Sequence, residues 1–273
     1  MNLLIKKITS LQNEKVKSLI KLRKRSQRTK SNKTFVDGTR EVLRVMNNTN
    51  LIKEFFINKE LLSETLLSKI YDYARSNRTA IYECENNVFK KIAYRENSDG
   101  LIAIVNTFKR KLDDIFLSKN PLILVSDGIE KPGNIGALIR AADAAGADAL
   151  VLINSKTDIL NPNVIRSSIA TVFLFPVIEC NIDCFFNYVI RNKIQTVGLI
   201  PAASESYITT DLRIPTAIIV GSEANGISEY CKKRLSKKIS IKMNGHNDSL
   251  NVSTAAAITL FECLRQRNSI NKN

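Results

Sequence analysis

Two glycine-bearing turns in the second half of the chain carry side chains that could hold a polar ligand. The first spans residues 127–136 and is followed, one helical turn later, by Arg140. The second spans residues 221–226 and has Glu223 in its middle. Each turn follows an apolar, strand-like run, and the ends of such strands are where open α/β sheets bind ligands. An arginine beside such a turn can hold a phosphate through two parallel hydrogen bonds.

A third polar stretch stands at the start of a predicted helix. Asp248, Ser249 and Asn251 precede an alanine-rich segment that runs toward Arg267. A helix start presents free backbone N–H groups, and small side chains there let a ligand approach the main chain. We therefore expect this stretch and the two turns to meet in one site, to which the first turn also contributes Asn134.

Each of these residues also fits an ordinary structural role. Ser249 alone fits a helix cap, Glu223 could cap the helix that follows it, and Arg140 alone fits a surface arginine. The glycines of the first turn lack the dinucleotide-binding spacing, and the position of Lys131 before the end of the loop excludes a P-loop. The functional interpretation therefore depends on the order of the three stretches.

Alternating strands and helices must position these turns. Beyond residue 120, near-continuous apolar strands separated by helices predict a mostly parallel sheet with helices on both faces. Residues 1–107 alternate in the same way and predict a smaller α/β domain. The stretch 108–120 mixes both charge signs and is the expected linker. Residues 23–33 are expected to form an exposed loop, and residues 172–177 a strand.

The positive charge is concentrated in the first part of the chain. The net charge of +15 divides into +12 for residues 1–120 (25 basic, 13 acidic) and +3 for residues 121–273 (16 basic, 13 acidic). This asymmetry predicts a polyanion-binding portion joined to a nearly neutral one. A merely solvated basic surface is the alternative. Membrane-surface binding is disfavoured because the basic run lacks an aromatic apolar face.

Several other classes of site and location are disfavoured by what the chain contains. The five cysteines are scattered, and His246 is the only histidine, so neither structural zinc nor a disulfide framework is expected. Buried free thiols are the simplest interpretation. No apolar run reaches the roughly 20 residues of a membrane span, and the N-terminus lacks the order of a secretory signal. A cytoplasmic protein without a metal site is expected.

Taken together, the three stretches resemble the motifs of the SpoU (TrmH-type) RNA ribose 2′-O-methyltransferases of the SPOUT superfamily. The resemblance covers residues 121–268, and residues 158–168 also look like the family's segment between the first two motifs. The sequence departs from the family pattern at Ala170, where a glycine is common, and at Ala141, where a threonine often follows the arginine. The matching residues are Asp127 with Asn134-x-Gly136-x-x-x-Arg140, then Val220-Gly-Ser-Glu223, then Ser249-Leu-Asn-Val-Ser253.

The resemblance implies a homodimer that transfers a methyl group from S-adenosylmethionine to a ribose 2′-hydroxyl of RNA. It implies a C-terminal domain, residues 121–273, with a deep trefoil knot, an exception to the rule that chains avoid threading. The cofactor would be held by backbone groups of Gly221, Ile241 and Leu250, with Leu199 and Met243 as apolar neighbours.

The N-terminal domain looks like the small ribosomal-protein-like α/β domain with which many family members bind RNA. This match depends on the element order and on the turn at residues 35–38, with Arg40 after it. The polar run before that turn could reach phosphates. The expected RNA-binding residues are Arg23, Lys24, Arg25, Arg28, Lys30, Lys33 and Arg40.

The chemistry of the reaction assigns roles to the polar residues. Displacement at a sulfonium needs alignment of the reactants and no metal. Arg140 is the family's usual candidate for the general base, but a guanidinium stays protonated in proteins. We therefore interpret Arg140 as a cation that orients the RNA phosphate and stabilises negative charge on the 2′-oxygen. Asn134, Glu223, Ser249 and Asn251 would position the ribose and Arg140, which completes the expected catalytic set.

Three alternatives remain open from the sequence. The two-domain layout resembles the ribosomal-RNA members of the family, but transfer RNA is an alternative substrate. A base rather than a ribose could receive the methyl group. A non-catalytic RNA-binding or ribosome-assembly factor could keep the same fold, although the intact catalytic set speaks against it.

Overall fold

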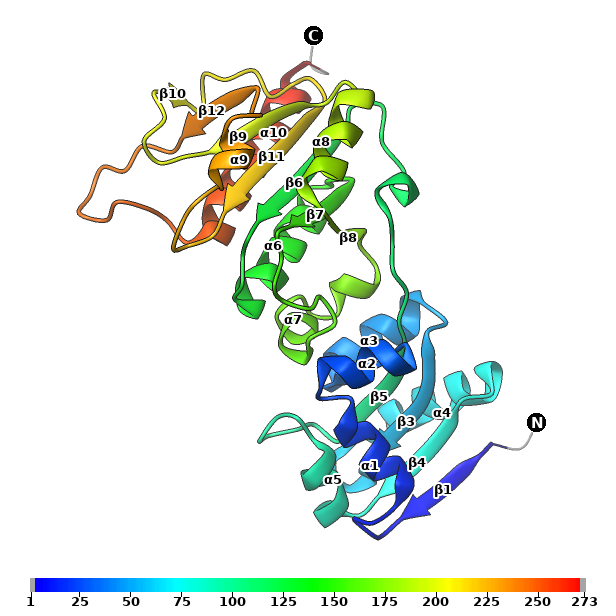
Figure 1. Cartoon of the computed structure of the whole chain (residues 1–273). Coiled ribbons are helices and arrows are strands. Elements are labelled where there is room, and N and C mark those ends of the chain that lie inside the picture. The colour runs from blue at the N-terminus through cyan, green and yellow to red at the C-terminus, as the bar shows by residue number, and fades with distance from the viewer. Residues whose placement is uncertain (1–2, 271–273) are drawn as a thin grey trace. The chain divides into compact units, whose positions relative to one another are not determined.

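The computed structural model describes residues 3–270, except for the side chain of residue 270. The outer ends of the two expected domain ranges, residues 1–2 and 271–273, lie outside the described residues. The described chain forms two compact units (Figure 1). Unit 1 contains residues 3–108 together with residues 160–174, and unit 2 contains residues 109–159 and 175–270.

Unit 1 is built on a mixed sheet of five strands in the order β1-β4-β3-β5-β2. β1, β4 and β3 run parallel, whereas β5 is antiparallel to both β3 and β2. The inner strand β5, between β3 and β2, is buried along almost its whole length, as its apolar sequence predicts. The strands are β1 (Ile5–Ile8), β2 (Lys33–Asp37), β3 (Ile52–Ile57), β4 (Ala80–Cys84) and β5 (Leu101–Asn106).

Helices cover both faces of this sheet. Phe56 stacks near Tyr82 in the cluster that also contains Val16 and Phe89, so α1 and α5 pack on that face. The neighbouring Phe55 points to the opposite face, where it meets Tyr73 of α4. The helices are α1 (Glu14–Lys21), α2 (Arg25–Ser31), α3 (Thr39–Asn48), α4 (Glu64–Asn77) and α5 (Asn86–Ile92), with a short 3-10 helix η1 (Lys59–Leu61).

The segment 160–174 belongs to unit 1, although it follows two strands of unit 2 in the chain. The Thr34 hydroxyl donates to the Leu160 carbonyl at 3.2 Å, and the Arg44 guanidinium donates to the Thr171 hydroxyl at 2.7 Å. The segment contains α7 (Pro162–Ser167) and the 3-10 helix η3 (Thr171–Phe173). The predicted strand at residues 172–177 is therefore wrong except for its last residue, where β8 begins. Its apolar side chains are buried in a helical turn that follows Ala170, a residue with positive φ.

Unit 2 is built on a parallel sheet of seven strands in the order β10-β12-β9-β11-β6-β7-β8. Every pairing among these strands is parallel, which confirms the predicted mostly parallel sheet. The strands are β6 (Leu122–Asp127), β7 (Ala149–Ile153), β8 (Val177–Cys180), β9 (Gln195–Leu199), β10 (Glu205–Ser206), β11 (Thr216–Gly221) and β12 (Lys237–Ser240).

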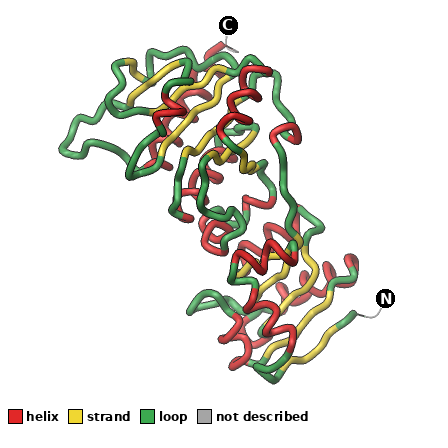
Figure 2. Tube along the Cα trace, in the orientation of Figure 1, coloured by secondary structure: helices red, strands yellow, loops and turns green. Residues whose placement is uncertain are grey.

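Helices lie on both faces of the parallel sheet, as the tube in Figure 2 shows. α10 packs against α6 and β11, while Phe185 and Val189 of α8 pack with Val151 and Ile219 on another core surface. The helices are α6 (Pro132–Ala144), α8 (Ile182–Arg191), α9 (Glu229–Lys232) and α10 (Val252–Ile270), and the expected linker contains a 3-10 helix η2 (Leu112–Asp114).

Residues 23–33 are not the exposed loop that their polar composition suggested. They contain α2, and the side chain of Arg28 is only 4% exposed. Its guanidinium donates to the carbonyls of Leu22 and Arg23 at 2.8 and 2.9 Å. A buried cation that is hydrogen bonded to backbone carbonyls can replace the apolar anchor that this segment lacks.

The five cysteines are free thiols, and three of them (Cys84, Cys231, Cys263) are buried. Cys184 is exposed, so the expectation of buried thiols holds only in part. Burial raises the pKa of Cys84, Cys180, Cys231 and Cys263 to about 12. Within residues 3–270, the structure contains no group of three metal-ligating side chains and no helix both long and apolar enough to cross a membrane.

Candidate active site

The register of two neighbouring strands brings the first and second turns together. β6 and β11 pair in parallel, with Asp127 opposite Gly221 at their carboxyl ends. Since parallel strands end at the same edge of the sheet, the loops that leave Asp127 and Gly221 must start side by side. The third stretch arrives there because α10, which it precedes, packs against α6 and β11.

Asp127 serves the structure of this edge. Its side chain is 2% exposed, and one carboxylate oxygen accepts from the Ser228 backbone N–H and hydroxyl at 2.8 and 2.7 Å. The other oxygen accepts from the Asn154 side-chain amide at 2.7 Å. The carboxylate therefore ties the loops after β6, β7 and β11 to one another, and it lies behind the site rather than in it.

The second turn folds back on itself so tightly that only glycine fits at its start. The backbones of Ser222 and Gly226 exchange two hydrogen bonds of 3.1 and 2.9 Å across the turn. A Cβ atom on Gly221 would lie 2.0 Å from the Gly226 carbonyl carbon and 2.1 Å from the Ile227 nitrogen. Gly226 has φ +63°, the left-handed conformation that glycine adopts without strain. The turn therefore brings two backbone segments closer together than any side chain at position 221 would allow.

A chain of side-chain hydrogen bonds connects all three stretches. The Asn134 side-chain amide donates to the Glu223 carboxylate, and the Asn251 amide donates to the Asn134 carbonyl oxygen at 3.2 Å. Lys131, at the start of α6, lies 4.0 Å from the same carboxylate. Asn134, Glu223 and Asn251 thus form one connected network.

Asn251, and not Ser249, caps the helix that follows. The Asn251 side-chain oxygen accepts from the Ser253 backbone N–H at 2.9 Å and from its hydroxyl at 2.6 Å. The Ser249 hydroxyl instead donates to the neighbouring Asp248 carboxylate at 3.1 Å. The cap interpretation of Ser249 is therefore wrong, because the helix begins two residues later than that role requires.

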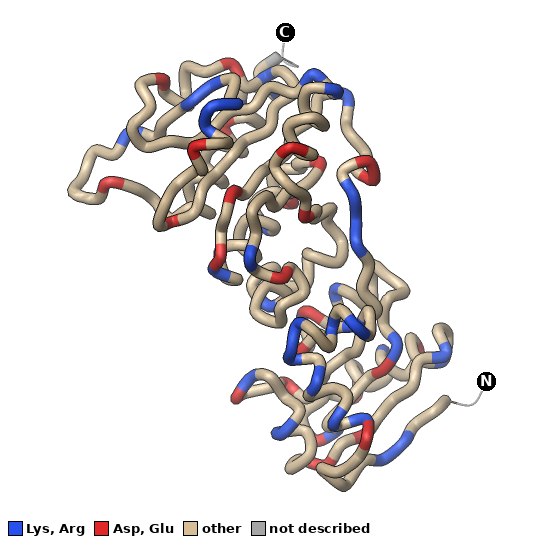
Figure 3. Tube along the Cα trace, viewed as in Figure 1, with Lys and Arg blue, Asp and Glu red and all other residues tan. Residues whose placement is uncertain are grey.

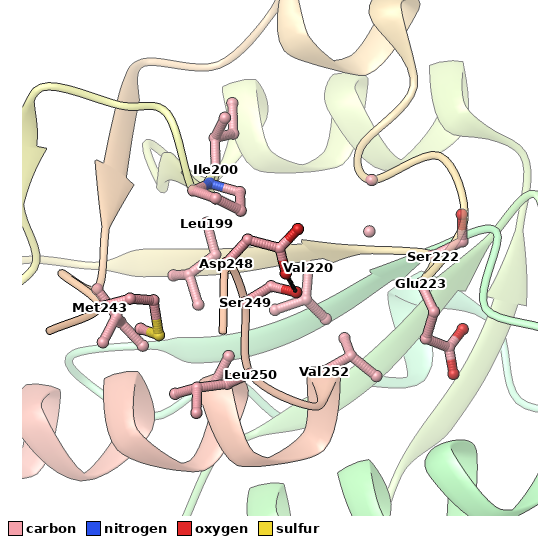
Figure 4. Close-up of a pocket in the computed structure, with 15 residues that line it drawn as sticks. Leu199, Ile200, Val220, Ser222, Glu223, Met243, Asp248, Ser249, Leu250 and Val252 are labelled. Atoms are coloured by element: carbon pink, nitrogen blue, oxygen red, sulfur yellow. Dashed lines mark hydrogen bonds between the residues drawn. The ribbon is translucent and has the colours of Figure 1, made fainter. Parts of the chain in front are cut away.

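A cavity of about 260 Å³ opens beside the second turn. Figure 4 shows that Glu223 stands at one end, Met243 at the other, and Ser249 between them. The side chains are mostly apolar, and the polar groups come from the turns. The lining residues are Leu199, Ile200, Pro201, Val220, Gly221, Ser222, Glu223, Gly226, Ile241, Met243, Asp248, Ser249, Leu250, Val252 and Ala255.

The cavity gathers all five residues expected to bind the cofactor, namely Leu199, Gly221, Ile241, Met243 and Leu250. They come from segments that lie between β9 and the start of α10. Sequence reasoning missed Ile200 and Pro201, which directly follow Leu199, and Ala255 on the first turn of α10. Their proximity in the sequence could have indicated them, because each lies within five residues of an expected site residue.

Arg140 does not line this cavity, and neither do Asn134 and Asn251. Asn134 and Asn251 are connected to it through Glu223. Arg140 lies exposed on α6, and no hydrogen bond or ion pair of its side chain is found among residues 3–270. Its guanidinium is therefore available to a ligand that approaches along α6.

The expected RNA-binding residues of unit 1 divide into two groups. Arg28 is buried, and Arg23 donates to the carbonyls of Lys91, Ile92 and Ala93 at the end of α5, at 2.9 to 3.2 Å. Both guanidiniums thus have structural roles, which for Arg28 contradicts the expectation that it reaches RNA. Lys24, Arg25, Lys30 and Arg40 are exposed, and Lys33 is half-buried. Figure 3 shows the concentration of basic residues along α1 and α2.

Comparisons with known proteins give relatives of the same architecture. The model of the SpoU rRNA Methylase family matches residues 121–261, and that of the MRM3-like substrate binding domain matches residues 13–103. The chain is 27% identical to a Bacillus subtilis protein named 23S rRNA (guanosine(2553)-2′-O)-methyltransferase RlmP, over 94% of this chain and 98% of that one.

Solved structures match almost the whole chain. A crystal structure of an RNA 2′-O ribose methyltransferase matches with a TM-score of 0.83 and 32% identity, covering 96% of this chain and all of the other. A crystal structure of an AdoMet-bound rRNA methyltransferase from Sinorhizobium meliloti matches with a TM-score of 0.86 and 26% identity. This match covers 96% of this chain and 98% of that one. The motifs, the parallel sheet and these matches agree, and the chain belongs to the SpoU rRNA methylase family.

Proposed function

We propose that this protein transfers a methyl group from S-adenosylmethionine to a ribose 2′-hydroxyl of ribosomal RNA. The observation that carries this proposal is the cavity beside Gly221, which is bordered by the Glu223–Asn134–Asn251 network. An apolar pocket with a few convergent polar groups suits the adenosine and methionine parts of the cofactor. By their names, the relatives above are a 23S rRNA 2′-O-methyltransferase, an RNA 2′-O ribose methyltransferase and an AdoMet-bound rRNA methyltransferase.

The residues would divide the work as follows. Backbone groups of Gly221, Ile241 and Leu250 would hold the cofactor, and Leu199 and Met243 would pack against it. Bound there, the cofactor supplies an electrophilic methyl group. Glu223 and Ser249, which line the cavity, would position the ribose together with Asn134 and Asn251.

Arg140 would act as an electrostatic catalyst in this proposal. Its exposed guanidinium would hold the phosphate next to the target ribose and stabilise negative charge on the 2′-oxygen as its proton leaves. A general-base role would predict a steep rise of activity with pH, matched in an Arg140→Lys variant of unchanged fold. That result would overturn the electrostatic role without touching the proposed reaction.

We also propose that the domains expected from the sequence have separate functions. Residues 1–107 bind RNA, residues 108–120 are the linker, and residues 121–273 bind the cofactor and catalyse the methyl transfer. Ribosomal RNA is favoured over transfer RNA because a substrate-binding domain model matches residues 13–103 and the relative named above acts on 23S rRNA. Such a substrate also supports a cytoplasmic location.

The trefoil knot and the homodimer belong to the same proposal. After β11 the chain passes to β12 on the far side of β9, and α10 then returns to pack on β11 and α6. This crossing is what a knot at the cofactor pocket requires. The homodimer is carried over from the family resemblance, and Phe261 on α10, which is 51% exposed, would be available to such an interface. Sedimentation analysis would test the dimer.

One experiment tests the reaction and its target together. The protein is incubated with S-adenosylmethionine labelled in its methyl group and with unmodified 23S rRNA, 16S rRNA or bulk tRNA. The expected product is a labelled 2′-O-methyl dinucleotide that resists nuclease, obtained from 23S rRNA. Label on a released base would show base methylation, label in tRNA would change the substrate, and RNA binding without transfer would favour a non-catalytic factor.

A further inference from the structure

Tyr94 is an exposed aromatic residue whose position is fixed from several sides. It follows α5 directly, and its side chain is 38% exposed. Its ring meets the buried ring of Phe35 edge to face, with centroids 5.7 Å apart. Its backbone N–H donates to the buried Asp37 carboxylate at 2.7 Å. An aromatic ring this well supported keeps its orientation in solvent, which an ordinary surface tyrosine does not need.

The turn at residues 35–38 builds this support. Phe35 supplies the ring beneath Tyr94, and Asp37 also accepts from the Arg95 backbone N–H at 3.2 Å and the Ser98 hydroxyl at 2.9 Å. Gly38 has φ +122°, a backbone conformation that residues with side chains rarely adopt, so the turn favours glycine. The sequence singled out this turn as a likeness to RNA-binding domains, and in the structure it holds the Tyr94 loop.

One cation lies against the exposed ring, and further cations lie close to Arg23 or Tyr94 in the sequence. The Arg23 guanidinium lies 6.0 Å from the centre of the Tyr94 ring and is fixed by three carbonyls at the end of α5. Lys90 and Lys91 are exposed in the last turn of α5, and Lys24 is exposed beside Arg23; none of these lysines has an ion pair within residues 3–270. Glu96 is the only acidic residue in the segment 86–98.

An exposed aromatic ring among unpaired cations is the arrangement that binds single-stranded nucleic acid, where bases stack and cations hold phosphates. We propose that Tyr94 is a stacking platform for an unpaired nucleobase of the substrate RNA, with Lys24, Lys90 and Lys91 holding the adjoining phosphates. This inference rests on the proposed RNA substrate and adds a base-contacting residue that the basic residues alone do not supply.

The absence of tryptophan from the chain provides a direct test. A Tyr94→Trp variant carries a single tryptophan, whose emission should fall when a base stacks on it. The titrant is a short single-stranded RNA, compared with an abasic RNA of the same length and charge. The matched control is Tyr71→Trp on α4, which covers the opposite face of the sheet. We expect quenching only for Tyr94→Trp and only with the base-containing RNA.

Substitutions separate stacking from a structural role. Tyr94→Phe should bind RNA as the wild type does, whereas Tyr94→Leu and Tyr94→Ala should bind about 5- to 100-fold more weakly, the range for one lost stacking contact. The dependence of affinity on salt should be unchanged in all three, because no phosphate contact is lost. Lys91→Gln should instead reduce the salt dependence. Thermal unfolding of each variant monitors the fold.

The outcomes distinguish this inference from the proposed function. Equal affinity of wild type and Tyr94→Leu, or equal quenching by abasic RNA, overturns the stacking platform while leaving methyl transfer intact. A wild-type protein that binds no RNA overturns both. Weaker binding by Tyr94→Phe as well would show that the hydroxyl, which accepts from the Asn163 side-chain amide at 3.3 Å, is required, and this contradicts stacking by the ring alone.

Discussion

The two units of this protein use buried polar groups in different ways. In unit 1, Asp37 and Arg28 are buried to hold loops and a short helix, and the exposed cations lie on the outer surface. In unit 2, buried Asp127 ties three loops together at the edge of a parallel sheet, and the candidate site is built from the backbone of those loops. A surface that binds a polyanion needs charge at many points, whereas a cofactor pocket needs one accurate backbone geometry.

This comparison predicts that replacing one glycine of unit 2 by alanine, which adds a single methyl group, disrupts the pocket. Gly221→Ala would place a Cβ atom 2.0 Å from the Gly226 backbone, so the turn must open. We expect loss of S-adenosylmethionine binding by more than about 100-fold, with RNA binding by unit 1 retained. Calorimetry measures the first and filter binding the second.

Gly133→Ala is the matched control, because a Cβ at Gly133 meets nothing within 4 Å. Gly133 lies in the first turn of α6, next to the same site, so alanine there should leave cofactor affinity unchanged. Wild-type cofactor affinity in Gly221→Ala would contradict the pocket assignment.

Substitution of Arg140 should lower the rate of methyl transfer and leave the affinity for the cofactor unchanged. Removing an electrostatic contact to the developing oxyanion costs about 10²- to 10³-fold in kcat. We expect this loss for Arg140→Ala, partial recovery for Arg140→Lys, and wild-type affinity for S-adenosylmethionine in both, because Arg140 does not line the cavity. Single-turnover methylation of RNA provides the measurement. A kcat within threefold of wild type in Arg140→Ala would remove this residue from the site.

Within α2, substitutions of two nearby cations should affect different properties, one the stability of the fold and the other the affinity for RNA. Arg28→Gln breaks the buried bonds to Leu22 and Arg23 and should reduce the free energy of unfolding by about 1–3 kcal/mol. Lys30→Gln should leave stability unchanged and lower the salt dependence of RNA affinity by about 0.7–0.9 per lost phosphate contact. Denaturant unfolding and RNA binding at several salt concentrations test both. An unchanged stability of Arg28→Gln would show that its burial is incidental.

The smallest predicted effect is on the pH dependence of stability, to which two carboxylates contribute. Burial raises the folded-state pKa of Asp37 in unit 1 above 3.8, whereas hydrogen bonds from Arg213 lower that of Asp211 in unit 2 to about 2. Asp211 therefore stabilises the fold above its unfolded pKa, and this contribution is lost as the pH falls from 3.8 toward 2. The contribution of Asp37 to stability changes with pH in the opposite direction. It is lost as the pH rises from 3.8 through the folded-state pKa of Asp37.

Asp211→Asn should accordingly be slightly less stable than wild type near neutral pH and equally stable near the acid limit, within about 1 kcal/mol throughout because the pair is exposed. Thermal unfolding across the acid range measures the difference. Side-chain carboxyl titration by NMR follows Asp37 and Asp211 in one experiment. A stability gap that widens on acidification would reverse the assigned sign.

Prediction from the sequence succeeded where a residue pattern has one structural solution. Continuous apolar runs such as residues 149–153 and 217–220 became buried strands, because such runs must be covered on both faces. Prediction failed at residues 23–33 and 172–177, where composition alone gave no sign of the outcome. In the first, a buried arginine replaces the apolar anchor, and in the second, apolar side chains are buried in a 3-10 turn.

The sequence by itself determined the family, the parallel sheet and the three polar stretches, because motif order and strand periodicity are properties of a linear chain. The tertiary structure alone decided how those stretches meet. The register of β6 against β11 sets Asp127 opposite Gly221, and the packing of α10 on α6 brings Asn251 to Asn134. It also decided that Asn251 rather than Ser249 caps α10, and that Arg28 faces inward while Tyr94 faces solvent. Such choices depend on contacts between residues far apart in the sequence, and no local pattern records them.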